Sequence, residues 1–262
     1  MKLPSERLDI LGVPIDFSDL PSVVPRIVAA ARARQPFQVA TVNLDFLVNS
    51  QRDDEVRSIL MDSQMNIPDG TPVVWAARFL GLDDAVRIAG ADLVPALVGA
   101  AAEEGLGVFL LGGEGGSAAD AARHLSTQFP SAVIDYFEPP CVPLDQFNDE
   151  EILDRIDRAQ PHILLVAFGH PKQEKWIRRH RAVLPMAAIG VGCSLDLIAG
   201  RQSRAPRWMQ KAGLEWSYRM VHEPRRLGPR YASNFVGMAS DLAPWVVAQR
   251  FNHFSLRTPE RA

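Results

Sequence analysis

Residues 107–118 read GVFLLGGEGGSA, and this stretch decides the fold that we predict. Its unbroken apolar run at 107–111 is typical of a strand that is covered on both faces of a parallel sheet. The glycines that follow suit a tight turn, and the Ala-rich segment Ser117–Gln128 is typical of a helix. A strand, a glycine turn and a helix in this order predict one unit of an α/β domain.

The same alternation extends in both directions from this stretch, almost to residue 200. Further β-like runs lie at 8–13, 37–42, 65–68, 132–136, 163–168 and 187–191. Segments of helical character lie between them, among them 21–34 and 91–104. The sequence therefore predicts a Rossmann-like, mostly parallel sheet with helices on both faces.

Composition is that of an ordinary globular protein. The chain has 262 residues, of which 47% are hydrophobic and 23% charged, so we expect one α/β core with an appendage. No apolar run reaches the roughly 18 residues that a membrane-spanning helix needs. The first residues, MKLPSERLDI, do not resemble a signal sequence. Cys141 and Cys193 are isolated, which favours a reducing cytoplasm over a disulfide framework or a zinc site.

The net charge of -3 conceals a strong division along the chain. Residues 201–262 carry 11 basic and 4 acidic side chains, whereas residues 1–200 carry 17 basic and 27 acidic ones. In the tail, arginines alternate with aromatic residues such as Trp208 and Trp216. We therefore divide the chain into a catalytic core, 1–200, and a helical, basic, membrane-associating appendage, 201–262. A basic tail indicates an anionic partner, which is nucleic acid, anionic lipid or a substrate diphosphate.

The glycine turn predicts a nucleotide site. Glycines let the backbone approach a diphosphate, and a following helix offers its N–H groups. The glycines at positions 113 and 115 with Ala118 also fit the dinucleotide fingerprint, and Asp135 in the next strand is a candidate ribose ligand. The alternative is a plain strand-to-helix turn. The nucleotide-binding candidates are Gly112, Gly113, Gly115, Gly116, Asp135 and Lys172, the last of which belongs to the stretch GHPKQE.

Polar residues follow two other predicted strands. Asp69, in the stretch NIPDG, comes after one strand and before a helix, where a general base can act. Its alternative role is that of a turn residue before Gly70. Thr41 and Asn43 end another strand on one side and are candidates to hold a sugar hydroxyl. Capping of the helix at 44–52 is the alternative for this pair.

The stretch GHPKQE at 169–174 follows the apolar run ILLVAF and opens a helix. Lys172 and Gln173 are candidates to contact phosphate and base or sugar. His170 is a possible base, although a single loop histidine is more often structural. For Glu174 the alternative to a site role is a surface pair with Arg178 at i,i+4.

Motifs that bind a catalytic metal are absent from the sequence. It has no D-x-D pair, no His/Cys cluster with metal spacing and no Walker loop. We therefore expect no metal and no cofactor. Backbone amides and arginines of the tail would then stabilise the negative charge on a leaving diphosphate.

Taken together, these motifs resemble the WecG/TagA/CpsF family, which is glycosyltransferase family 26. The matching stretches run in the family's order from about residue 8 to 235, and they are TVNLDF, PDGTPVVWAARFLG, RIAGADLVPAL, VFLLGGEGG, GHPKQEKWI, IGVGCSLDLIAG, RAPRWMQKAGLEWSYR and EPRRLGPRY. The resemblance implies a Rossmann-like core whose C-terminal appendage works at the membrane.

The resemblance also implies an activity. Such an enzyme moves a sugar, with inversion, from a UDP-sugar to an undecaprenyl-diphosphate-linked sugar in polysaccharide or teichoic acid synthesis. N-acetylmannosamine, its uronic acid and hexoses stay open as the donor sugar. We expect a cytoplasmic enzyme that is peripheral on the inner face of the plasma membrane, an anionic membrane surface but no nucleic acid as partner, and possible homo-oligomers.

By resemblance, site roles pass to individual residues. Asp69 takes the role of the family's aspartate, Thr41 and Asn43 that of the polar pair beside it, and Gln173 that of the family's glutamine. The appendage arginines correspond to Arg219, Arg225, Arg226 and Arg230. Two other classes remain as alternatives: an NAD-dependent dehydrogenase that uses Gly113, Gly115 and Ala118, and a nucleic-acid-binding module that uses the basic tail.

Overall fold

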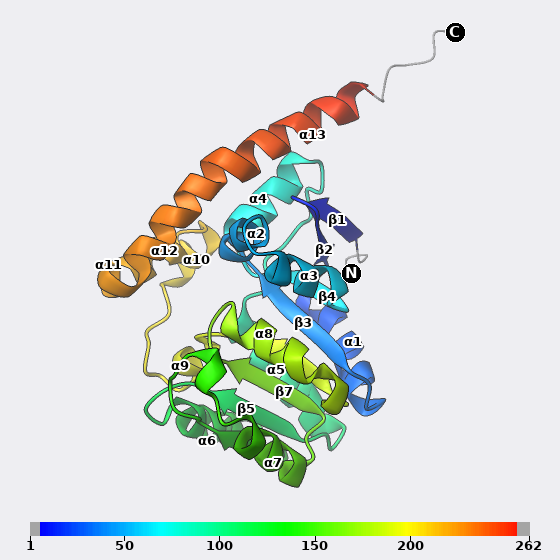
Figure 1. Ribbon diagram of the computed structural model, residues 1–262, viewed down its shortest axis with the longest axis vertical. Helices are drawn as coiled ribbons and strands as arrows, with labels where there is room; N and C mark the ends of the chain where they lie inside the picture. Colours follow the sequence, from blue (N-terminus) through cyan, green and yellow to red (C-terminus); the bar gives the residue numbers. More distant parts are fainter. Residues whose placement is uncertain (1–5, 256–262) are drawn as a thin grey trace.

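The computed structural model describes residues 6–255, without the side chains of Lys211, Arg226 and residues 252–255. Its centre is a six-stranded, wholly parallel sheet of order β4-β3-β8-β7-β5-β6 (Figure 1). The strands are β3 Phe37–Val42, β4 Met65–Pro68, β5 Val108–Gly112, β6 Ile134–Phe137, β7 Ile163–Ala167 and β8 Ala187–Gly190. The predicted α/β fold is confirmed. The apolar runs form the strands of this sheet, because such runs need cover on both faces.

Alternate residues of each strand pack into different layers. On one face, Val108 and Leu110 are buried with the helices α1 Leu20–Arg32, α5 Gly90–Glu103, α6 Ser117–Gln128 and α9 Ser194–Ile198. On the other face, Phe109 and Leu111 are buried with α7 Asp149–Ala159 and α8 Lys172–His180. Short 3₁₀ turns, η1 Leu144–Gln146 and η2 Arg181–Val183, flank this second layer.

The first predicted strand, 8–13, is wrong, because the chain reverses inside it. Residues 6–17 form an antiparallel hairpin of β1 Glu6–Ile10 and β2 Val13–Phe17. Leu11 and Gly12, with φ of 56° and 77°, make the turn, and Asp9 Oδ1 accepts a hydrogen bond from the Gly12 amide at 2.7 Å. A leucine in the left-handed region is uncommon, so the apolar pattern concealed the turn.

A third cluster of apolar side chains covers the β3 and β4 end of the sheet. It holds the hairpin and the helices α2 Leu44–Ser50, α3 Asp54–Asp62 and α4 Thr71–Phe79. From the tail, Leu242 and Val246 are buried in the same cluster, with Trp245 packed against it. The part of the tail around Leu242 and Val246 is therefore packed on the core.

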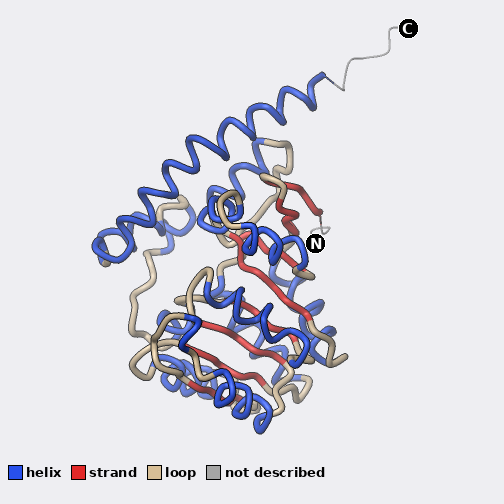
Figure 2. The backbone as a smooth tube through the Cα atoms, viewed as in Figure 1, coloured by secondary structure: helices blue, strands red, loops and turns tan. Residues whose placement is uncertain are grey.

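The tail is helical, as predicted. It comprises α10 Arg207–Lys211, α11 Glu215–His222, α12 Pro224–Gly237, the π-helical turn η3 Met238–Leu242 and α13 Ala243–Ser255. Figure 2 shows a loop that rises from the lower part of the molecule to α10, and Figure 1 shows α12 and α13 as one long rod above α2 and α4. Within residues 6–255, none of the helices has the length and apolar character needed to cross a membrane.

Candidate functional site

Asp69 lies just beyond β4, at the carboxyl edge of the sheet. Its backbone N–H donates to Val42 O at 2.8 Å, which joins the loops after β3 and β4. Gly70 makes this close approach possible, because a Cβ there would lie 2.8 Å from the Cα of Asn43. The NIPDG motif therefore brings the Asp69 carboxylate next to the end of β3, where ligands of open α/β sheets bind.

Within residues 6–255, Arg87 is the cation that forms an ion pair with Asp69. Its loop is fixed by a hydrogen bond from the Ile88 amide to Pro68 O at 2.8 Å. Arg87 Nε lies 3.6 Å from Asp69 Oδ1, and Arg87 Nη2 lies 2.6 Å from Glu215 Oε2. The sequence analysis gave no role to Arg87 or Glu215, which are 128 positions apart in the chain.

The Asp69 carboxylate is strongly desolvated. Its side chain is 27% exposed, and burial raises its pKa to about 7, against an opposing effect from Arg87. Glu215 and Asp92 add to the rise, while Arg219 opposes it. A carboxyl group with a pKa near neutral is suited to give and take protons at physiological pH.

The charges continue from Asp69 into the tail. Beyond Glu215, Arg204 Nε lies 3.9 Å from Glu215 Oε1, and the Arg204 guanidinium pairs with both oxygens of Asp92 at 2.5 and 2.6 Å. The pKa of Asp92 is lowered, chiefly by the hydrogen bond from Arg204. Two tail residues and three core residues thus form one charged network over the carboxyl edge.

The predicted tail arginines have different surroundings. Arg219 is partly buried, and burial lowers its pKa, but Cys193, Tyr231, Glu223 and Asp69 outweigh this and raise it. Arg230 Nη2 lies 2.9 Å from Asp45 Oδ2, which ties α12 to α2. Arg225 is exposed, and the side chain of Arg226 lies outside the described residues. Among the three whose side chains the structure describes, Arg219 is the one whose charge acts on Asp69.

Thr41 and Asn43 flank Val42, whose carbonyl oxygen accepts the hydrogen bond from the Asp69 amide. Asn43 Oδ1 accepts hydrogen bonds from the Asp45 and Phe46 amides, so the capping alternative holds for this atom. Thr41 is buried, and its hydroxyl donates to Gly190 O at 2.9 Å, which links β3 to β8. Contact of either residue with a sugar stays a prediction.

Gln173 is buried and joins two loops. Its Oε1 accepts from the amides of Gly169 and Gly192, both at 3.1 Å, and its Nε2 donates to Glu174 Oε1 at 2.7 Å. Gly190 leaves room for it, since a Cβ there would lie 2.4 Å from Gln173 Nε2. In this conformation Gln173 holds the loops after β7 and β8 together, and its contact with a substrate remains untested.

Glu174, the neighbour of Gln173, does not form the surface pair with Arg178 that was the alternative to a site role. Glu174 is buried, and its Oε2 lies 3.0 Å from His170 Nδ1, while the His170 ring stacks on Phe46 at 3.8 Å. The surface pair between Glu174 and Arg178 is therefore wrong, because α8 turns Glu174 inward and Arg178 instead pairs with Asp62 at 2.5 Å. His170 has the structural surroundings that a single loop histidine usually has.

The glycine turn is already occupied by a carboxylate. All four of its glycines have positive φ, and Glu138 accepts from the Gly116 and Ala118 amides at 2.7 and 2.5 Å. A diphosphate would have to displace this side chain to bind those two amides. Glu138 follows β6, and no motif in the sequence pointed to it.

The other two nucleotide-binding candidates flank the turn. Asp135 is exposed on the edge strand β6, where its Oδ1 accepts from the amide of Tyr136. Lys172 Nζ lies 3.5 Å from Val142 O, and its charge acts on Cys141 beside Glu114. Lys172 therefore faces the glycine turn from the start of α8, whereas Asp135 lies on the outer strand.

Comparison with known proteins agrees with this geometry. The model of the glycosyl transferase WecG/TagA/CpsF family matches residues 8–252. The chain is also 31% identical over 195 residues to the Bacillus subtilis (strain 168) N-acetylglucosaminyldiphosphoundecaprenol N-acetyl-beta-D-mannosaminyltransferase, covering 72% of each chain. The chain belongs to the WecG/TagA/CpsF family. It is a glycosyltransferase of the hexosyltransferase class, and this activity replaces the dehydrogenase alternative.

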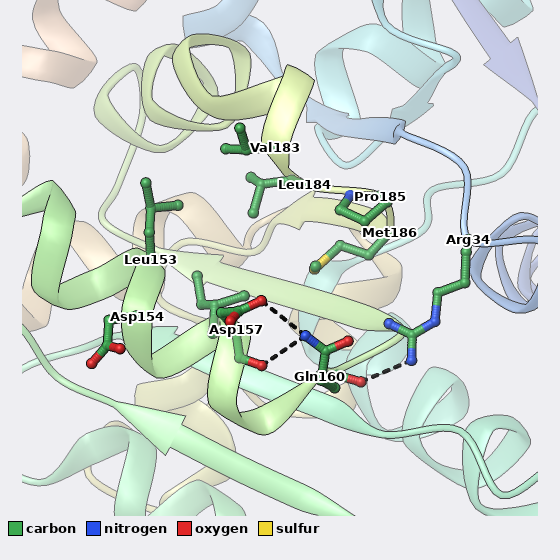
Figure 3. Close-up of a pocket in the computed structure, with 10 residues that line it drawn as sticks. Arg34, Leu153, Asp154, Asp157, Gln160, Val183, Leu184, Pro185 and Met186 are labelled. Atoms are coloured by element: carbon green, nitrogen blue, oxygen red, sulfur yellow. Dashed lines mark hydrogen bonds between the residues drawn. The ribbon is translucent and has the colours of Figure 1, made fainter.

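One pocket of this WecG/TagA/CpsF glycosyltransferase lies away from the site. It has a volume of ≈ 400 Å³, and its lining includes Arg34, Gln160 and Met186. These residues immediately precede or approach β3, β7 and β8, so the pocket opens at the amino edge of the sheet, opposite Asp69. Figure 3 shows Arg34 directed at Gln160, whose carbonyl accepts from Arg34 Nη2 at 2.9 Å. This arginine fastens the loops before β3 and β7.

The cations near Asp69 in this WecG/TagA/CpsF protein are arginine side chains. Among the residues that the structure describes, no three His, Cys, Asp or Glu side chains are grouped so that they could hold an ion. The charges near Asp69 are instead the guanidinium groups of Arg87, Arg204 and Arg219. Only the last of these was predicted from the sequence, although Arg87 opens the family-like stretch RIAGADLVPAL.

Proposed function

We propose that this enzyme transfers an N-acetylmannosaminyl group from a UDP-sugar to a polyprenyl-diphosphate-linked N-acetylglucosamine. The observation that carries the proposal is Asp69, with its pKa raised to about 7, at the carboxyl edge of the sheet and beneath the basic tail. The donor and acceptor sugars follow those in the name of the Bacillus subtilis relative. A uronic acid derivative or a hexose is the alternative donor, since selection between such sugars depends on pocket shape.

In the proposed mechanism, ionised Asp69 takes the proton of an acceptor hydroxyl. The oxygen attacks C1 of the donor sugar from the face opposite UDP, the bond from C1 to the diphosphate oxygen breaks, and the configuration inverts. Negative charge grows on the leaving diphosphate. Arg219 on α11 stabilises this negative charge. Its side chain is partly buried, and the neighbouring groups raise its pKa, so the guanidinium stays protonated.

We place the nucleoside of UDP at the glycine turn. The Glu138 carboxylate already accepts hydrogen bonds from the Gly116 and Ala118 amides, and it would repel a second anion at those donors. A ribose hydroxyl, by contrast, donates a hydrogen bond to a carboxylate that keeps its amide partners. The diphosphate then extends from the turn toward the tail arginines, and we assign Lys172, at the start of α8, to contact it.

The tail is the proposed contact with the membrane. Large apolar side chains are exposed along it, among them Trp208 at 63%, Val221 at 77% and Phe251 at 71%. Arginines beside them, such as Arg207 and Arg225, are exposed as well. Apolar groups with neighbouring cations suit the interface of an anionic leaflet. We propose a peripheral enzyme on the cytoplasmic face of the plasma membrane, where a polyprenyl diphosphate is presented.

The test is a transfer assay with purified full-length protein. A panel of UDP-sugars is offered with polyprenyl-diphosphate-linked N-acetylglucosamine, with and without EDTA. We expect the highest kcat/KM with UDP-N-acetylmannosamine and equal rates in chelator, since arginines supply the countercharge. A different preferred donor overturns the sugar assignment, and activity that EDTA removes and Mg²⁺ or Mn²⁺ restores overturns the metal-free mechanism.

A further inference from the structure

The Arg87 guanidinium is shared between two carboxylates that come from different parts of the chain. Asp69 belongs to the core, and Glu215 opens α11 in the tail. Arg87 Nη2 lies 2.6 Å from Glu215, whereas Arg87 Nε lies 3.6 Å from Asp69. The Glu215 side chain is 13% exposed, so this contact is largely removed from water. Arg87 is therefore bound more closely by the tail than by Asp69.

This sharing has a chemical consequence for Asp69. An arginine that pairs closely with a carboxylate stabilises its charged form and makes it a weaker base. Glu215 holds the guanidinium at its own carboxylate and also adds negative charge near Asp69. If Glu215 is removed, Arg87 loses the closest carboxylate that draws it away from Asp69.

We propose that Glu215 is a positioning residue, which docks the tail on the core and holds Arg87 back from Asp69, so that Asp69 stays basic while the tail is docked. The proposal rests on the general-base role of Asp69 proposed above. It goes beyond that role, because it assigns the tail a part in setting the strength of the base.

The charged groups around Asp69 come from both the core and the tail. Arg87 from the loop before α5 and Arg219 from α11 lower the pKa of Asp69, and Arg204 from the loop before α10 is a further cation that interacts with it. Glu215 from α11 and Asp92 from α5 raise this pKa, and burial raises it most. Loss of Glu215 removes one of these carboxylates and frees Arg87, so both changes lower the pKa of Asp69. A loosened tail would also admit water and act in the same direction.

The experiment is a pH–rate profile of kcat/KM for the full chain from pH 5 to 9. In Glu215→Gln we expect the acid limb to move to lower pH by about one unit, and kcat at pH 8 to fall about tenfold as the base weakens. In Arg87→Gln the acid limb moves the other way, to higher pH, because Asp69 loses its cation. Opposite movements are not expected from two variants that only damage packing.

Asp45→Asn is the matched control. It breaks another tail-to-core ion pair, the one with Arg230, and Asp45 is not among the groups that act on Asp69. Its acid limb should stay where the wild-type limb lies. Glu215→Asp keeps the carboxylate and should restore most of the wild-type profile, which separates charge from side-chain shape.

Two failures remain distinguishable. If Asp69→Asn keeps more than a tenth of wild-type turnover, the general-base role itself is wrong, and the role of Glu215 falls with it. If Asp69→Asn is inactive and the acid limb lies in the same place in wild type, Glu215→Gln and Arg87→Gln, only the role of Glu215 is overturned. If Glu215→Gln does not fold, the upward movement in Arg87→Gln and the profile of Glu215→Asp decide the question.

Discussion

Two carboxylates lie at the carboxyl edge of the same sheet and are held in opposite ways. Glu138, beside the glycine turn, accepts two backbone N–H bonds at 2.5 and 2.7 Å. Asp69, beyond β4, has Arg87 at 3.6 Å as its ion pair and is otherwise desolvated. Desolvation destabilises the charged form of a carboxylate, as at Asp69. We therefore propose that the Glu138 end anchors the substrate and that the Asp69 end transfers the proton.

The largest effect is expected from Asp69→Asn. Asparagine keeps the shape but cannot accept the proton, and a positioned base contributes roughly 10²–10⁴ in rate. Turnover should fall by that factor, while UDP binding at the other end of the sheet stays near wild type. Initial rates with a saturating acceptor, together with a calorimetric titration of UDP, measure both. A variant that turns over at more than a tenth of the wild-type rate would remove Asp69 from proton transfer.

The same substitution should stabilise the fold, and more at high pH than at low pH. Asp69 has a pKa of about 7 in the folded protein, against an ordinary value near 3.9, so the unfolded chain gives up this proton more readily. The free energy of unfolding of the wild type therefore falls as pH rises between these values. The upper limit of the loss is about 4 kcal/mol, at about 1.4 kcal/mol for each pKa unit.

Thermal unfolding at pH 5 and pH 8 measures this effect. Asn cannot ionise, so the Tm gain of Asp69→Asn over wild type should be larger at pH 8. Asp135→Asn on the exposed edge of β6 serves as a control, because its carboxylate is not desolvated in this way. An equal gain at both pH values would contradict the raised pKa, and with it the contrast between the two ends of the sheet.

Glu138→Gln tests the other end of the comparison. A hydrogen bond to a charged group contributes about 1.5–3 kcal/mol, so we expect UDP to bind about tenfold more weakly or worse, with kcat less affected. Calorimetric titration of UDP with this variant and with Asp135→Asn separates the two ribose candidates. If UDP binds more weakly to Asp135→Asn than to Glu138→Gln, the ribose contacts β6 itself rather than the residue beyond it.

Local features of the sequence account for what could be predicted. The β-like runs matched five of the six parallel strands to within one residue and β6 to within two. Several of these runs are continuously apolar, because burial on both faces of a sheet requires such runs. Asp69 could be placed because the carboxyl end of a strand is where ligands bind. Leu11 concealed a turn, since a leucine seldom adopts positive φ.

The missing parts of the site are those that depend on distant segments. Arg87 and Glu215 are separated by 128 positions, so no local pattern pairs them. Glu138 lies beyond the end of β6, and its role depends on how the edge strand bends toward the glycine turn. A single acidic residue in a basic segment, such as Glu215 in GLEWSYR, was the available signal. A negative charge within a basic segment indicates that this position pairs with a cation elsewhere in the fold.

The smallest effect concerns the tail surface that lies outside this network. Arg207 and Arg225 are exposed, and each basic residue near an anionic leaflet strengthens attachment by about fivefold. Arg207→Gln and Arg225→Gln should each weaken sedimentation with vesicles that contain anionic lipid by about that factor at low salt. High salt should abolish the difference, because exposed charges are screened.

Arg158→Gln, on α7 of the core, removes the same charge from a side chain that is 77% exposed, and should sediment like wild type. Point variants are preferable to truncation, since Leu242 and Val246 are buried in the core cluster and their loss would expose it. If the tail variants and Arg158→Gln sediment alike, the tail does not attach the enzyme to the membrane through these arginines, and its remaining role is the one that Glu215 and Arg219 have beside Asp69.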